Sequence, residues 1–258
     1  MKKLTTLLFV LVFASSMAFA QSNDADVDQD GDNQDATVTQ MQNQNSATVD
    51  QMTDNAGPQE ATVYQDGFSN VATISQSQTG GGNNDPKSVA KIEQLGNNNW
   101  AKQSESAGSY NSNQHAYSRQ DGNRNWSSQT AVSGYNIDMD VLQVGNNNDA
   151  KQTANGAYNS ADITSLGNGN YAEQSVTNSS YATIYQDGSS NYAFQDLNDG
   201  SYTSPSVNAD IEQLGNNNWA SQTQTGEGLT ATTKQFSSGN WADIDQSGYN
   251  STATVTQN

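Results

Sequence analysis

The sequence predicts an all-β fold: a β-solenoid of stacked strand–turn–strand β-arches, with two facing parallel sheets and Gln/Asn ladders inside. Three observations predict it. Apolar and amide residues alternate at every second position in a pattern that recurs along the chain. Gly and Asn follow most copies of that pattern at fixed offsets. Hydrophobic residues make up only 32% of the chain, below the roughly 45–50% of ordinary globular proteins, so one large apolar core is not expected.

Residues 1–20 are expected to be a secretory signal peptide rather than part of the fold. Lys2 and Lys3 precede an apolar run at residues 7–13, and Ala18-Phe19-Ala20 forms a small-x-small cleavage site. Such a segment is too short and wrongly flanked for a stable membrane span, and no later segment has the ~20 apolar residues that a span needs. We therefore expect residues 21–258 to be secreted, without membrane insertion.

The first strand of each arch is predicted from the pattern Ala-x-Val/Ile-x-Gln. Alternate positions of a strand face the same side, so these three residues would all point into the interior. Disordered sequence of biased composition would not keep such a register. Intact copies begin at Ala25, Ala36, Ala47, Ala61, Ala72, Ala90, Ala182, Ala209, Ala242 and Ala253. Weaker copies begin at Ala116, Met139, Ala161 and Ala231.

The turn and the second strand are predicted from the residues after the Gln. Gly usually stands two places on and Asn five places on, as Gly96 and Asn99 do after Gln94. Both residue types accept the positive φ of a chain reversal. A small residue and a second Gln then give a strand of the same parity, and in the middle units this Gln comes two places earlier than elsewhere. Residues 61–258 are mostly ~22-residue repeats, whereas residues 21–60 are shorter 11-residue half-repeats.

One arch cannot bury its thin inner face, so the arches must stack, at ~4.8 Å per layer. Stacking places each inward Gln or Asn above its counterpart in the next layer. Hydrogen bonds between these amides, here called amide ladders, would satisfy groups that otherwise cost about 1–3 kcal/mol each when buried. The expected members are Gln65, Asn70, Gln94, Asn99, Gln120, Asn125, Gln143, Asn148, Asn170, Gln186, Asn191, Gln213, Asn218, Gln235, Asn240 and Gln246.

A Gln-x-Gly-x-x-Asn-x-Ala repeat with a flanking Gln, in an exported chain without cysteine, resembles the curlin family, the subunits of bacterial curli amyloid fibres. The resemblance implies a β-solenoid subunit secreted unfolded through an outer-membrane curli secretion pore. It also implies that the chain polymerises with itself on a nucleator subunit, into a cell-surface fibre of a bacterium for biofilm matrix and adhesion. This chain carries more repeats than a five-repeat curlin, so major-subunit, nucleator and accessory roles all stay open.

The repeat pattern extends from Ala25 to Gln257 with no segment that resembles a cap. Soluble solenoids hide the unpaired N–H and C=O groups of their end strands under caps. Uncapped end strands would instead be templates for the next copy. The alternative function is a capped monomeric β-solenoid that serves as an ice- or glycan-binding module.

Aromatic residues follow the turn Asn in most units. Their parity is opposite to that of Asn and Ala, so they should point outward and stack along one edge. This aromatic stripe either only fixes the strand register or offers an exposed surface for fibre bundling or glycan contact. It comprises Trp100, Trp126, Tyr171, Tyr192, Trp219 and Trp241.

Alternating aspartates near the start match the opening of a calcium-binding loop. They are Asp26, Asp28, Asp30 and Asp32. The match is weak, because position twelve is Thr37 rather than Glu and the flanking pattern is that of strands. A solvated acidic face is the alternative interpretation.

Composition excludes several function classes. The chain has no Cys and one His, His115, so neither a thiolate metal site nor a pair of catalytic histidines can form. The formal charge of −18 argues against nucleic-acid binding, which needs clustered Lys and Arg. A polysaccharide-cleaving solenoid would need a distinctive pair of carboxylates, and here the acids are spread evenly. We expect no enzyme, no cofactor and, apart from the calcium candidate, no metal.

Overall fold

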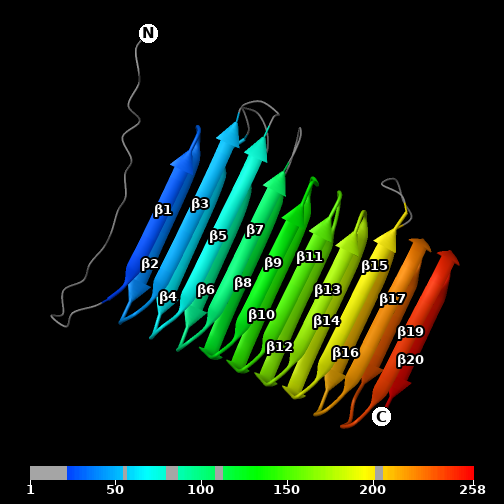
Figure 1. The fold of residues 1–258 in the computed structure, drawn as a ribbon. Coiled ribbons are helices and arrows are strands. Elements are labelled where there is room, and N and C mark those ends of the chain that lie inside the picture. Colours follow the sequence, from blue (N-terminus) through cyan, green and yellow to red (C-terminus); the bar gives the residue numbers. More distant parts are fainter. Residues whose placement is uncertain (1–21, 55–56, 80–86, 108–112, 201–205) are drawn as a thin grey trace, which may run out of the picture.

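The computed structural model describes residues 22–54, 57–79, 87–107, 113–200 and 206–258. The expected signal peptide at residues 1–20 lies outside the described residues. Within those ranges the chain forms strands and turns and no helix, which confirms the predicted all-β class (Figure 1). Nowhere in them is there a helix long and apolar enough to cross a bilayer.

The strands of the described residues form two ten-stranded sheets, and consecutive strands alternate between them (Figure 1). Each strand pairs in parallel with the strand two places along the chain, as β4 does with β6, so the predicted β-solenoid is confirmed. Sheet A contains β1(Asp24–Asp30), β3(Ser46–Asp54), β5(Val71–Thr79), β7(Trp100–Ala107), β9(Trp126–Val132), β11(Asp149–Asn155), β13(Tyr171–Thr177), β15(Tyr192–Asp199), β17(Trp219–Glu227) and β19(Trp241–Tyr249). Sheet B contains β2(Gln34–Met41), β4(Gln59–Asp66), β6(Ser88–Leu95), β8(Gln114–Asn123), β10(Ile137–Asn146), β12(Ser160–Asn168), β14(Ser180–Ser189), β16(Val207–Leu214), β18(Thr230–Gln235) and β20(Thr252–Gln257).

Period-two alternation decides which side chains enter the space between the sheets. In β4, Ala61, Val63 and Gln65 are fully buried, whereas Thr62 and Tyr64 between them are partly exposed. The same alternation recurs in β6 and β16. Because one inner position of most strands is Ala, the two sheets approach closely and the apolar interior is thin.

The turns from sheet B to sheet A use the positive φ expected from Gly and Asn. Gly96 has φ +109° and Asn98 has φ +58°. A Cβ on Gly96 would lie 2.0 Å from the carbonyl oxygen of Gly122 in the next layer. Glycine is therefore required there both by the backbone conformation and by the close approach of the neighbouring layer.

The described part of the half-repeat region, residues 22–54 and 57–60, contributes to the same two sheets as the later repeats. The strands β1, β2 and β3 alternate between sheet A, sheet B and sheet A. An interval of 11 residues holds one strand and one short turn. Consecutive half-repeats therefore occupy opposite sheets, and two of them make one layer.

Candidate assembly surfaces

The predicted ladder residues lie in the interior between the sheets, and all of them except the half-buried Asn240 are buried. In sheet B the Gln amides bond from layer to layer at 2.8–2.9 Å from Gln40 through Gln143. The column then meets Ser165, whose hydroxyl donates to Gln186 at 3.1 Å. It continues from Gln186 to Gln257 at 2.8–3.0 Å.

In sheet A the Gln residues do not stay at one inward position of the strand. Twice along the stack, the inward position that holds Gln in one layer differs from the one that holds Gln in the next. The register aligns Ile74 with Gln103, and it later aligns Gln222 with Ile244. Between these points the amides from Gln103 to Gln222 bond in sequence at 2.8–3.1 Å. The predicted member Gln246 lies outside this run, and its amide lies 2.8 Å from that of Gln224. The early Gln of the middle units is thus the member of a separate ladder.

The buried Asn of each turn holds together two successive layers. Asn99 Nδ2 donates to the carbonyl oxygen of Gly122 at 2.9 Å, and Asn99 Oδ1 accepts from the backbone N–H of Asn125 at 3.0 Å. Asn125 makes the same two bonds to Gly145 and to the next Asn. Asn99 and Asn125 therefore satisfy their own amide groups while they fix the turn of the next layer.

In the first layers of sheet A, Gln29, Gln51 and Gln76 bond in sequence at 2.7–2.8 Å. A buried acid, Glu105, ends this first sheet A ladder. Only 3% of Glu105 is exposed. Its Oε2 accepts from Gln76 Nε2 at 2.8 Å, and its Oε1 has no hydrogen-bond donor among the described residues. Burial raises the pKa of the Glu105 carboxyl to about 8, although the Gln76 bond acts in the opposite direction. A neutral carboxyl is therefore the form that fits this position at neutral pH.

Sequence reasoning missed the role of Glu105. The available signal was its place in the repeat, since Glu105 aligns with Gln76 of the preceding layer and with Ala131 of the following one. An acid at an inward position is rare in this chain: most acids of the described strands point outward, and Asp199 at the end of β15 is another buried one.

The aromatic stripe lies on the outer face of sheet A, beside the turns. Trp100 and Trp126 stack with ring centroids 5.2 Å apart. A second run joins Tyr171, Tyr192, Trp219 and Trp241 at 4.9–5.9 Å. Asp149 aligns with both Trp126 and Tyr171 and so interrupts the stripe. Trp241, at the end of the stack, is 61% exposed.

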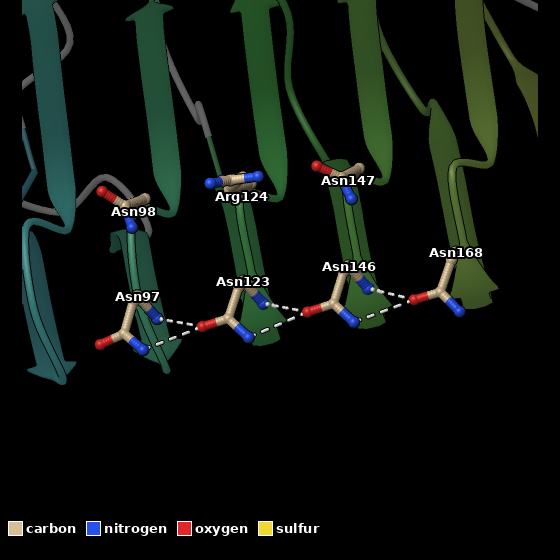
Figure 2. Close-up of a pocket in the computed structure, with 7 residues that line it drawn as sticks. All are labelled: Asn97, Asn98, Asn123, Arg124, Asn146, Asn147 and Asn168. Atoms are coloured by element: carbon tan, nitrogen blue, oxygen red, sulfur yellow. Dashed lines mark hydrogen bonds between the residues drawn. The ribbon is translucent and has the colours of Figure 1, made fainter.

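A second, solvent-facing column of Asn side chains runs along the turns and lines a shallow hollow (Figure 2). Asn97, Asn123, Asn146 and Asn168 bond side chain to side chain at 2.9–3.0 Å. Sequence reasoning did not single out this column, although its signal was present: an Asn directly follows the turn Gly in these units. These hydrogen bonds help to hold the successive turns in register.

The calcium candidates are not brought together. Asp26, Asp28 and Asp30 lie on the extended strand β1 and alternate with inward residues, and Asp32 follows in the turn, where its N–H donates to Thr53 Oγ1 at 3.0 Å. No three of their carboxylates lie within 4.8 Å of one another in the described chain. The residues therefore form an acidic outer face of an end strand rather than a loop closed around one ion.

One other group of titratable side chains lies on the outer face of sheet B. His115 Nδ1 is 2.7 Å from Asp138 Oδ1 and 3.9 Å from Asp140 Oδ1. These three ligand atoms lie close enough together to hold a metal ion. The hydrogen bond to Asp138, with the nearby carboxylates, raises the pKa of His115 against the effect of its partial burial. The arrangement is accounted for by a hydrogen-bonded His–Asp pair between adjacent layers.

The four end strands have an unpaired edge within the described residues. β1 and β2 pair only with β3 and β4, and β19 and β20 pair only with β17 and β18. The backbone N–H groups of Thr230 and Phe236 donate toward β20. Because N–H groups alternate sides along a strand, those of Thr252, Thr254 and Thr256 point away from the body.

The comparisons with known proteins give one match. A family model described as a curlin associated repeat matches residues 226–258, which hold β18, β19 and β20. No curated protein and no solved structure matches the chain. The matched segment aligns in register with the earlier layers, for example Ala231 with Ala209.

Proposed function

We propose that this chain, in which residues 226–258 match a curlin associated repeat, belongs to the curlin family and is a secreted structural subunit that self-assembles into extracellular curli-like amyloid fibres. The fibres would contribute to biofilm matrix and adhesion at the surface of a bacterium. A nucleator subunit and an outer-membrane curli secretion pore are the further partners that the family implies. Since the family and the β-solenoid fold are structural, no catalytic role is proposed.

One observation carries the proposal: among the described strands, both end layers have an unpaired edge, and the two ends repeat the same inner pattern. An exposed strand edge is a template for another chain unless it is covered or disrupted. The inner residues Ala242, Ile244, Gln246, Ala253, Val255 and Gln257 correspond in kind to Ala25, Val27, Gln29, Ala36, Val38 and Gln40. A second copy can therefore continue both sheets with Ala beside Ala, Val or Ile beside Val, and Gln beside Gln, as in the layers within one chain.

The first test is electron microscopy of residues 21–258 over time, together with thioflavin binding. Fibres that bind thioflavin and diffract at ~4.7 Å are expected. A chain that stays monomeric for days at neutral pH with salt would instead favour a monomeric binding module.

A single substitution tests the end edge directly. Thr254→Pro removes an outward N–H of β20 and leaves the groups that face β18 in place, and proline is tolerated at sheet edges. We expect slow elongation with an intact monomer fold by near-ultraviolet circular dichroism. Thr254→Ala, which keeps the N–H, is the control and should elongate like the wild type. Equal elongation by all three chains would contradict growth through this edge.

A further inference from the structure

The outer faces of the two end strands of sheet A carry aspartates at corresponding positions. Asp243 and Asp245 are exposed on β19, and Asp26 and Asp28 are exposed on β1. The chain aligns its own layers so that inner Ala lies beside inner Ala, as Ala220 does beside Ala242. In the same frame a second copy would bring Asp243 beside Asp26 and Asp245 beside Asp28.

The strands behind each end bring no positive charge to this contact. β3 aligns Thr48 with Asp26 and Asp50 with Asp28. β17 aligns Ser221 with Asp243 and Thr223 with Asp245. No Lys, Arg or His lies on β1, β3, β17 or β19. Stacking of a second copy would thus make a column of three carboxylates, from Asp245, Asp28 and Asp50. Beside it would lie the carboxylate pair of Asp243 and Asp26.

In the internal layers, several outward acids are paired with a lysine of an adjacent layer. Carboxylates on the outer faces contact a lysine in several places, as Glu173 does with Lys151 at 2.7 Å and Glu212 with Lys234 at 2.9 Å. Acids also align within one chain, as Asp28 does with Asp50. Because both belong to the same chain, their repulsion does not oppose the binding of a second chain. Between copies the same repulsion opposes association itself.

The sheet B half of the contact carries one acid, the exposed Asp35 of β2, which would lie beside the uncharged Thr252 of β20. In the common frame Thr254 of β20 would lie beside Thr37 of β2, and Thr256 beside Thr39. Cross-strand Thr pairs are favourable on an exposed face. The two halves of one junction therefore differ: sheet B favours contact and sheet A opposes it.

We infer that the partner of the β19–β20 end is the β1–β2 end of a second copy, and that the aspartates of sheet A make this junction the charge-controlled step of assembly. This inference rests on the proposed function. Like charges about 5 Å apart near a surface repel appreciably in low salt, and salt near 1 M screens them within about 3 Å. Assembly of the wild type should therefore be slow in low salt and fast in high salt.

The test measures the critical concentration and the elongation rate of residues 21–258 in low and high salt. The double variant Asp26→Asn/Asp28→Asn should assemble at a roughly tenfold lower critical concentration in low salt, and the difference should disappear in high salt. The matched control is Asp196→Asn/Asp210→Asn, which removes the same charge from outer positions that align with Ser or Thr in adjacent layers.

A charge reversal separates repulsion at the junction from net charge. Asp243→Lys would place a cation beside Asp26 at every junction and should assemble faster than Asp196→Lys, which has the same net charge. Equal behaviour of the end variants and their controls overturns the inference while fibres still form. If neither the wild type nor any variant forms fibres even in high salt, the proposed function itself fails.

Discussion

The buried carboxyl of Glu105 gives a stability prediction with a definite sign. The pKa of Glu105 is about 8 in the folded chain and near its ordinary value of 4.5 in the unfolded chain. The folded chain thus binds the proton more tightly. The stability linked to this proton is fully present below about pH 4.5 and is lost as the pH rises toward 8.

The magnitude follows from the two pKa values. At 1.36 kcal/mol per pH unit, the carboxyl costs the folded chain about 3 kcal/mol at pH 7 and about 5 kcal/mol above pH 8. Glu105→Gln replaces the carboxyl with a neutral amide of nearly the same size in a ladder of amides. The variant should therefore match the wild type at pH 4 and exceed its free energy of unfolding by these amounts at higher pH.

The assay is urea unfolding of freshly diluted chain, below the concentration at which it assembles, followed by tryptophan fluorescence from pH 4 to pH 9. The control is Glu93→Gln on the outer face. Partial burial raises the pKa of Glu93, but hydrogen bonds from Lys91 and Tyr117 outweigh it and lower that pKa. Stability from Glu93 is therefore lost as the pH falls, the opposite direction. A wild type whose stability is flat from pH 5 to pH 8, or a Glu105→Gln variant with the wild-type slope, would show that the folded chain does not raise the pKa of Glu105.

Three further predictions concern single features of the repeat. Gly145→Ala would place a Cβ 1.9 Å from the carbonyl oxygen of the next turn at a φ of +114°, so we expect the midpoint of thermal unfolding to fall by several degrees; an unchanged midpoint would contradict the close approach. Asn148→Ala removes two hydrogen bonds, one donated to the carbonyl oxygen of Gly167 at 2.9 Å and one accepted from the N–H of Asn170 at 3.0 Å. The free energy of unfolding in urea should fall by about 2–4 kcal/mol. A fall below ~0.5 kcal/mol would show that other contacts fix the turn. Changing the four Trp to Ser should reduce lateral bundling of fibres in electron micrographs while elongation continues, and unchanged bundling would leave the stripe only a role in strand register.

Much of the fold could be predicted because the side to which each residue of a strand points depends only on its place in that strand. A residue such as Ile92 between Ala90 and Gln94 can face the interior only together with both, so the period-two pattern determined the inner face of each strand. The turn positions were equally accessible, since Gly96 and Asn98 are among the few residue types that tolerate positive φ.

Other features depend on neighbours in the stack and could not be predicted from one repeat. Either Ile or Gln fits the inner position that Ile74 shares with Gln103, because both are inward and of similar length. The sequence contains both versions, and only the register between layers shows where one ladder ends and another begins. The contact of His115 with Asp138 likewise depends on how β8 aligns with β10.

In the proposed fibre, copies add end to end, and each contributes a full set of layers. The most direct measurement is the mass per unit length of single fibres by scanning transmission electron microscopy. With ten strands per sheet at ~4.8 Å per layer, we expect one chain for about every 48 Å of fibre. One chain for every ~4.8 Å, a mass per length about ten times greater, would mean that chains stack flat upon one another and not end to end.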